Sequence, residues 1–440
     1  MSTKPNPKTN NEIKRTDKTP TFIDISTMVE ARPGRGHLHS FHYAIRVAST
    51  SHFKESLIFG SLEEGGKEIK PVFQRKHFDR GLGTFFHTIN LKKDLRRINS
   101  ALDSIPGHKL LHFYEGGFRE LSILVSLTKE RNDFVALFNL FSLDPWLKLL
   151  SRRNPFRRQV ALLLKFIISE LSPKVAFTLD SEGAVRALKT DTGLENLHTY
   201  PLFSSIEENR VKEKWHGREV DFLFSPRTRD EKKLVVQTLI RLEKDTSRDR
   251  NRNIVIISRW KSKFSSGELS GLDLRSLKVN VINGSLSEDE YEKLFKSSRV
   301  VVLPYLDKHY ELGSSGKVMD ALAANSIPVA PADTSAGKFI KSIGAGYTFK
   351  GSSESLTEVL LQIDLEKAPA YDIPHPSVEN SVLKIAKLTS ELNPSKIELE
   401  NDSAVRFLPF LASFSAWRWV AIHLVLSPAK ILISKLGLKI

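Results

Sequence analysis

The stretch 299–349 constrains the fold of this chain more than any other. It opens with an apolar, β-branched run, 300–303 (VVVL), which ends at Pro304 and is typical of a buried parallel strand entering a loop. The loop 310–316 (YELGSSG) is rich in small and hydroxyl residues, and an apolar-periodic segment follows it. A strand, a loop and a helix in this order predict half of a nucleotide-binding α/β domain.

The start of the predicted helix has the local chemistry of a phosphate site. Ser315 and Gly316 leave backbone N–H groups at the positive end of the helix, where anions bind, and Lys317 can add a charge. Asn325 is suited to the left-handed residue after a helix, and the next strand is expected at 327–330.

These residues resemble a known family. The segments 303–305 (LPY) and 320–329 (DALAANSIPV) are similar to the donor-binding region of GT-B glycosyltransferases, in particular the retaining family 4 (group 1) enzymes. The resemblance implies an α/β protein of the GT-B fold: two Rossmann-like domains with an interdomain cleft. It also implies a nucleotide-sugar as substrate, bound by the second domain, an acceptor bound by the first domain, and neither a cofactor nor a metal.

The resemblance assigns roles to several residues of the second domain. It implies that Asp320 contacts the ribose and that Asn283 and Gly284 border the base. Glu311 is a candidate catalytic acid facing the donor sugar, although Leu312 stands where the family has its first acid. The alternative interpretation makes Glu311 a solvated loop acid and Lys317 a surface lysine.

Two cations are expected to neutralise the donor diphosphate. By resemblance these are Arg227 and Lys232. Arg229 and Lys233 are the alternatives if the alignment with the family is shifted by one or two residues. A nucleoside diphosphate leaves with developing negative charge, which paired cations stabilise, so the assignment agrees with the chemistry.

Composition sets further bounds. With 440 residues, 40% of them hydrophobic, the chain can form two domains. It has no cysteine, which excludes disulfides and thiolate metal sites and fits a reducing, cytoplasmic compartment. The formal charge of +15 favours anionic partners, but no nucleic-acid motif is present, so nucleic acid is not an expected partner.

Strands and helices alternate along the chain, which predicts parallel sheets. The expected organisation is a disordered tail at 1–20, an acceptor-side domain at 21–205, a linker at 206–218, a nucleotide-sugar domain at 219–375, and a return helix with an amphipathic segment at 376–440. The last full strand of the first domain is expected at 175–181.

A glycine- and base-rich loop follows the first predicted strand. Gly36 lies where GT-B enzymes bring the first domain against the donor, and His37 and His39 are candidates for a base, a diphosphate contact or an acceptor ligand. Packing or capping histidines are the alternative. A zinc site built with His42 is disfavoured, because no acid stands in ligand spacing.

Other polar residues fall at predicted strand ends, where ligands of parallel sheets bind. They are Tyr114, Glu115, Asn139 and Asp144, of which Glu115 or Asp144 could orient or deprotonate an acceptor hydroxyl. The alternative is a cap or a loop hydrogen bond.

Two segments combine basic and apolar residues. Segment 144–158 carries four arginines and a lysine beside Trp146, and segment 407–440 is apolar but interrupted by Arg418, His423 and Pro428. Both fit an anionic membrane surface, peripheral on the inner face of the cell membrane, with packing against the protein as the alternative.

The sequence therefore predicts a glycosyltransferase that moves a sugar from a nucleotide-sugar to a hydroxyl of a glycan or lipid-linked acceptor, in cell-surface polysaccharide or glycolipid synthesis. A non-catalytic GT-B-like scaffold or carbohydrate-binding protein is the alternative, and a GT-B-fold epimerase is a third hypothesis.

Overall fold

The computed structural model describes most of the chain between positions 19 and 393. The described residues are 19–26, 37–61, 69–73, 82–114, 117–140, 157–204, 206, 215–245, 251–258, 263–265, 268–269, 271–284, 286–306, 310, 313, 315–369 and 376–393.

The first domain is built on a seven-stranded parallel sheet with the order β3-β2-β1-β4-β5-β6-β7. Its strands are β1 (Thr21–Ile25), β2 (Ser56–Ser61), β3 (Ile69–Phe73), β4 (Lys109–Phe113), β5 (Phe134–Asn139), β6 (Val175–Leu179) and β7 (Leu197–Thr199). Its helices are α1 (His37–Ser49), α2 (Leu82–Asp103), α3 (Phe118–Glu130), α5 (Arg157–Leu171) and α6 (Glu182–Thr192).

The second domain is built on a six-stranded parallel sheet with the order β10-β9-β8-β11-β12-β13. Its strands are β8 (Val220–Phe224), β9 (Arg252–Ser258), β10 (Leu277–Asn283), β11 (Ser298–Val302), β12 (Ile327–Pro331) and β13 (Tyr347–Phe349). Its helices are α7 (Arg229–Asp245), α8 (Glu288–Lys296), α9 (Gly316–Ala323), α10 (Ser335–Ile343) and α11 (Ser353–Gln362).

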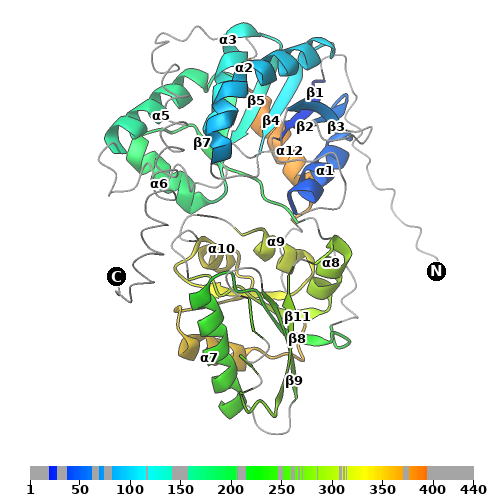
Figure 1. Cartoon of the computed structure of the whole chain (residues 1–440), viewed down its shortest axis with the longest axis vertical. Helices are drawn as coiled ribbons and strands as arrows, with labels where there is room; N and C mark the ends of the chain where they lie inside the picture. The colour runs from blue at the N-terminus through cyan, green and yellow to red at the C-terminus, as the bar shows by residue number, and fades with distance from the viewer. Residues whose placement is uncertain are drawn as a thin grey trace, which may run out of the picture.

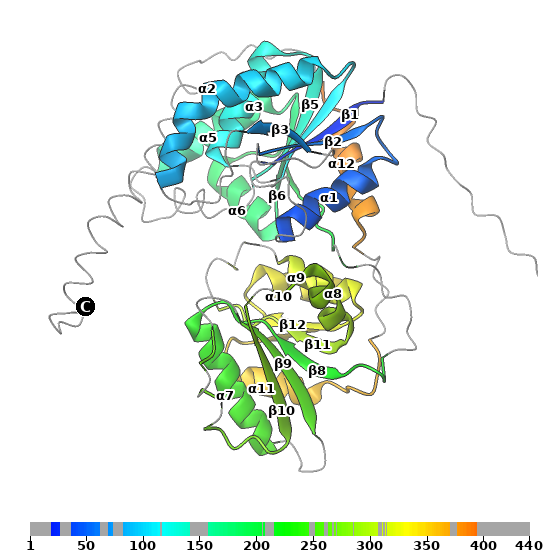
Figure 2. The same ribbon diagram turned by 45° about the vertical axis from the view of Figure 1, so that its right-hand side comes forward.

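Both sheets follow the doubly wound strand order, and the two domains lie one above the other (Figure 1). Helices α9 and α10 of the second domain lie on its side nearest the first domain (Figures 1 and 2). Two Rossmann-like domains in this arrangement are the α/β, GT-B architecture expected from the sequence.

Apolar packing explains why the central strands form. All five residues of β1, β4, β6, β8 and β12 are buried, as parallel strands covered on both faces require. Asn325 adopts φ 54° after α9, as predicted, and Ser287 and Glu290 form the capping box of α8.

The last described helix, α12 (Val378–Thr389), returns to the first domain. It packs against α1, β5 and β6, and Val382 and Ile385 are fully buried there. In Figure 1 this orange helix lies among the blue and cyan elements of the first domain.

Two parts of the first sheet differ from expectation. Strand β3 is not foreseen, because Pro71 interrupts its pattern, and its position at the edge is where a strand tolerates proline. The first sheet also does not end with β6, since residues 197–199 form the short edge strand β7 instead of only leading to the linker.

No helix in the described residues is long and apolar enough to cross a membrane. The predicted membrane-surface segment 407–440 lies outside the described residues, as do residues 144–156 of the predicted segment 144–158 and residues 1–18 of the predicted tail 1–20.

Candidate functional site

The second sheet has its topological switch point between β8 and β11. These strands are neighbours, with Leu223 opposite Val301, and the chain leaves them toward opposite sides of the sheet. Ligands of such sheets bind in the crevice beyond the carboxyl ends of these strands. Several of the predicted donor residues follow β8 and β11 directly.

Arg227 lies three residues after β8, and its backbone is held in place. The Glu231 carboxylate, which is fully buried, accepts the N–H of Arg227 at 2.6 Å and that of Thr228 at 3.2 Å. Burial raises the pKa of Glu231, against the lowering effect of the N–H groups of Arg227, Leu306 and Thr228. The exposed Arg227 side chain donates to the hydroxyl of Tyr310.

Two tyrosines support this arginine. The rings of Tyr305 and Tyr310 stack with centroids 4.0 Å apart and planes at 10°. Tyr305 is buried, and its hydroxyl lies 3.2 Å from that of Ser315, the N-cap of α9. Burial raises the pKa of Tyr305 against the lowering effect of Arg227, so the phenol stays protonated. The stacked pair therefore links Arg227 to the start of α9.

Lys317 completes the cluster from the first turn of α9. Its ammonium group donates to the hydroxyl of Ser225, the first residue after β8. The predicted Arg227, Ser315, Gly316 and Lys317 thus come together at one crevice, which we call the second-domain switch site together with Ser225, Tyr305 and Tyr310. Two cations, four hydroxyls and a helix start are groups that bind phosphate.

Lys232 has a different environment. Its ammonium lies 2.6 Å and 2.9 Å from the two oxygens of Glu268 and donates to the carbonyl of Lys263 at 3.0 Å. A diphosphate contact for Lys232 stays a prediction. The alternatives in register, Arg229 and Lys233, are exposed on α7.

The residues predicted to border the base lie at the end of β10. The Asn283 amide accepts the N–H of Phe264 at 3.1 Å and donates to its carbonyl at 3.0 Å, so it fixes a neighbouring loop. Gly284 has φ 130°, a conformation that favours glycine, and a Cβ there would meet open space. The backbone beyond β10 is therefore shaped by these two residues.

Asp320 is buried, with 1% of its surface exposed. One carboxylate oxygen accepts the hydroxyl of Ser204 at 2.7 Å, and the other accepts that of Tyr291 at 2.9 Å. Its predicted ribose contact is untested, but both oxygens accept hydrogen bonds from the protein.

Several predicted residues cannot be placed. Gly36, Glu115, Asp144 and Glu311 lie outside the described residues. The backbones of His37 and His39 form the first turn of α1, but their side chains are outside the described part.

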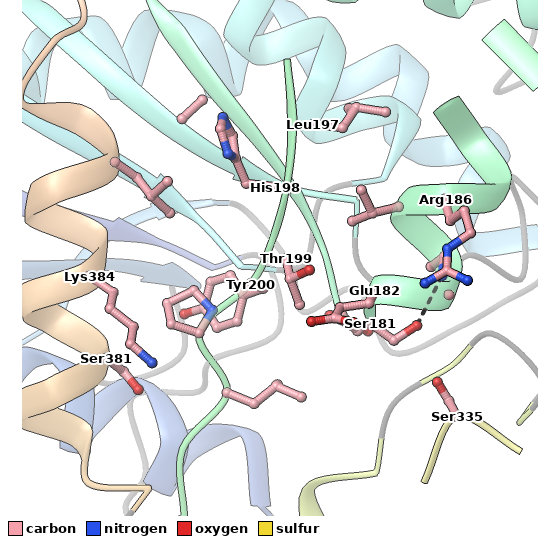
Figure 3. Close-up of a pocket in the computed structure, with 18 of the residues that line it drawn as sticks. Ser181, Glu182, Arg186, Leu197, His198, Thr199, Tyr200, Ser335, Ser381 and Lys384 are labelled. Atoms are coloured by element: carbon pink, nitrogen blue, oxygen red, sulfur yellow. Dashed lines mark hydrogen bonds between the residues drawn. The ribbon is translucent and has the colours of Figure 1, made fainter. Parts of the chain in front are cut away.

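A cleft of about 2420 Å³ lies between the two domains. Figure 3 shows Ser181, Glu182 and Thr199 of the first domain on one side and Ser335 of α10 on the other, with Lys384 of α12 at its margin. Ser315 and Met319 of α9 also line it, so the cleft reaches the second-domain switch site. Its volume exceeds the roughly 300–1,000 Å³ of an ordinary small-molecule pocket.

One acid of the cleft is oriented from within the first sheet. Asp180, which follows β6, accepts the Asn139 amide N–H at 2.9 Å, and Asn139 in turn accepts the Thr178 hydroxyl at 3.2 Å. Asn139 is among the strand-end residues predicted from the sequence, whereas Asp180 is not. Its position directly after an apolar strand is the signal that identifies it.

The first sheet has its own switch point, between β1 and β4. There Asp24 lies opposite His112, and both are fully buried. The Asp24 carboxylate lies 2.7 Å from Nδ1 of His112 and 2.5 Å from Nδ1 of His42 on α1. Nε2 of His112 lies 3.0 Å from the hydroxyl of Tyr200.

We call Asp24, His42, His112 and Tyr200 the first-domain switch cluster. The charge of Asp24 determines the directions of its hydrogen bonds. Burial acts to raise the pKa of Asp24, but charge and hydrogen-bond effects of His42 and His112 lower it to about 2. An ionised carboxylate only accepts hydrogen bonds, so both Nδ1 atoms donate to it. Burial raises the pKa of Tyr200, which keeps its hydroxyl protonated. These roles were not predicted from the sequence, although an acid and a histidine inside apolar strands are a visible signal.

Among the described residues, no group of three or more His, Asp or Glu is arranged to hold a metal ion.

The chain matches no protein-family model and no curated protein sequence. Its structure is similar to solved structures at low identity. UDP-GlcNAc 2-epimerase from Neisseria meningitidis, bound to UDP-GlcNAc, is 10% identical, with 84% of this chain and 98% of that chain covered and a TM-score of 0.49.

WaaG, a glycosyltransferase involved in lipopolysaccharide biosynthesis, is 12% identical, with 90% and 99% covered and a TM-score of 0.47. UDP-GlcNAc 2-epimerase from Methanocaldococcus jannaschii, in complex with UDP-GlcNAc and UDP, is 12% identical, with 83% and 99% covered and a TM-score of 0.44. None of these similarities identifies a substrate or an activity for this chain.

Proposed function

We propose that this protein is a glycosyltransferase that binds the diphosphate of a nucleotide-sugar at the second-domain switch site. The observation that carries the proposal is the convergence of Arg227, Lys317 and the start of α9 beyond β8 and β11, at the margin of the interdomain cleft. The resemblance of segments 303–305 and 320–329 to family 4 enzymes supports it independently.

The chemistry follows from these groups. Transfer breaks the bond between the sugar and the diphosphate, so negative charge develops on the departing phosphate oxygen. The guanidinium of Arg227 can make two parallel hydrogen bonds to phosphate oxygens, whereas Lys317 supplies a point charge. The N–H groups at Gly316 and Lys317 add dipoles of the same sign. Lys232 would join them by exchanging Glu268 for a phosphate.

The acceptor hydroxyl is expected in the cleft on the first-domain side. Asp180 is oriented there by Asn139, and Glu182 is exposed at the start of α6. His37, His39 and Glu115 remain candidates for the acceptor side, and Glu311 for the donor sugar. A glycan or lipid-linked acceptor, a role in polysaccharide or glycolipid synthesis, and retention of anomeric configuration belong to this proposal. A cytoplasmic location, peripheral on the membrane, is also part of this proposal.

The first test is thermal stabilisation by UDP, GDP, TDP and ADP and by their glucose, mannose and N-acetylglucosamine conjugates. A ligand present at about 100 times its dissociation constant stabilises the folded state by about 2.7 kcal/mol, which raises the melting temperature. We expect one nucleotide family to act selectively and Arg227→Ala to lose the shift. Lys244→Ala is the matched control, because Lys244 is exposed in the last turn of α7, far from the site.

The alternative, a scaffold or carbohydrate-binding protein, gives a different result. A scaffold would not be stabilised by any nucleotide, and Arg227→Ala would leave its binding to glycans unchanged. Release of nucleoside diphosphate from the selected nucleotide-sugar, with water or a glycan as acceptor, then separates transfer from binding. An epimerase would instead convert the nucleotide-sugar without releasing the diphosphate.

A further inference from the structure

The carboxylate of Asp320 connects parts of the chain that are distant in sequence. It lies in the second turn of α9, the helix whose first turn carries Lys317. The residue that donates to its Oδ1 atom, Ser204, is 116 positions earlier, in the segment that leads from β7 to the second domain. This segment is the first of two crossings between the domains.

Ser204 also contacts the second crossing. Its backbone N–H donates to the carbonyl of Pro376 at 2.9 Å, just before α12 returns to the first domain. Its hydroxyl, while donating to Asp320, accepts the N–H of Ile206 at 3.0 Å. One serine therefore joins both crossings to α9.

The opposite oxygen of Asp320 is fixed from within the second domain. Tyr291 of α8 donates its hydroxyl at 2.9 Å, and its ring packs on Phe295 with centroids 4.5 Å apart. Ser204 is 5% exposed and Asp320 1% exposed. A carboxylate buried to this degree is costly to leave without its donors, so the two contacts are strongly favoured together.

We infer that Asp320 is a positioning residue that couples the donor-side helix α9 to both crossings between the domains, and does not bind the ribose. The effect of this coupling on ligand binding rests on the proposed function. The coupling between α9 and the two crossings is independent of that function.

The coupling has a consequence for binding. Pro201, Leu202 and Pro376 on the crossings and Val318 and Met319 on α9 line the same cleft. When a ligand changes the separation of the domains, the crossings move, and Ser204 transmits the displacement to Asp320. The start of α9, with Lys317 and Ser315, shifts with it because α9 is a short rigid helix. Occupation of the cleft thereby adjusts the donor site.

The first test needs no ligand. Thermal unfolding is measured for the full chain, Ser204→Ala, Asp320→Asn and the double variant, with Ser342→Ala as the control because its hydroxyl bonds only within α10. We expect both single variants to lower the melting temperature and the double variant to be no less stable than Asp320→Asn alone, since contacting residues are non-additive. Additive losses would overturn the coupling.

The second test uses UDP, GDP and their 2′-deoxy forms in calorimetric titrations. We expect Ser204→Ala and Asp320→Asn to weaken nucleotide binding by similar factors, about fivefold, and to leave the ratio of ribose to deoxyribose affinity unchanged. The inference is overturned if Asp320→Asn abolishes a preference for ribose that Ser204→Ala retains. If the unmodified chain binds no nucleotide, the proposed function fails, while the unfolding test still decides the coupling.

Discussion

The two switch points of the molecule have the same topology and opposite chemistry. In the first sheet, Asp24 of β1 lies opposite His112 of β4. At the matching position of the second sheet, Leu223 of β8 lies opposite Val301 of β11. All four side chains are buried. The polar groups at the first switch point lie inside the strands, whereas those of the second-domain switch site lie beyond the strand ends.

This difference separates a stabilising cluster from the proposed binding site. The buried first-domain switch cluster bonds to itself and holds β1, β4, α1 and the segment after β7 together. In the second domain Leu223 and Val301 pack within an apolar cluster, and Arg227, beyond the strand end, is exposed. Both sheets have the same strand order, so it is the placement of the charges that favours the second switch point as the proposed ligand site.

The largest expected effect is on the stability of the first domain. Asp24→Ala leaves two buried imidazoles without their carboxylate, and removing one partner of such a group costs about 3–5 kcal/mol. Urea unfolding should show this loss in the first domain, with nucleotide affinity of the folded protein changed less than twofold. A loss below about 1 kcal/mol would contradict the stabilising role.

Arg227→Ala should lower nucleotide affinity strongly and stability hardly at all, the reverse of Asp24→Ala. Hydrogen bonds to charged groups contribute about 1.5–3 kcal/mol, so nucleoside diphosphate affinity should fall about 10- to 100-fold in calorimetric titrations. Because the side chain is exposed, stability should change by less than about 0.5 kcal/mol. Lys244→Ala should change neither quantity. Equal affinities for Arg227→Ala and Lys244→Ala would contradict the assignment.

Acid should weaken the first-domain switch cluster. The pKa of Asp24 is about 2 in the folded chain and 3.8 ordinarily, so its contribution is complete above about pH 4 and is lost as the pH falls toward 2. Ionised Asp24 contributes about 2 kcal/mol to the free energy of unfolding. Urea unfolding between pH 5 and pH 2 should show the stability gap between the unmodified chain and Asp24→Asn narrowing. A gap that stays constant over this interval would count against an ionised Asp24.

Tyr310→Phe should have the smallest effect. It removes the hydroxyl that accepts from Arg227 but keeps the ring that stacks on Tyr305. This bond is exposed and acts on the ligand only through the position of Arg227, so we expect a loss of about 0.5–1.5 kcal/mol, or about twofold to tenfold in nucleotide affinity. Tyr347→Phe, at an exposed ring on β13, is the control. A Tyr310→Phe affinity equal to that of the control would show that the hydroxyl does not position Arg227.

Local signals in the sequence were sufficient for the centre of the second domain. The strand at 300–303, the small-residue loop and the apolar period after Lys317 are contiguous, so they predicted β11 and α9, whereas the role of Arg227 came from the family resemblance. Strand β3 was missed because Pro71 breaks the period that identifies strands.

The missed contacts are those between distant residues. Asp24 and His112 are 88 positions apart, and Ser204 and Asp320 are 116 apart. A single sequence shows that each residue is polar within an apolar context, but only the three-dimensional fold shows which residues face each other. The ribose contact of Asp320 stays a prediction from the family resemblance, which transfers a role without the surrounding contacts.

The most direct test of the central claim is the contribution of the diphosphate to binding. The affinities of a nucleoside and its diphosphate, chosen from the thermal panel, are measured for the unmodified chain and for Arg227→Ala/Lys317→Ala. We predict that the unmodified chain binds the diphosphate about 100-fold more tightly than the nucleoside and that the double variant loses this difference. A difference that persists in the double variant would contradict the claim, because the diphosphate would then be bound elsewhere.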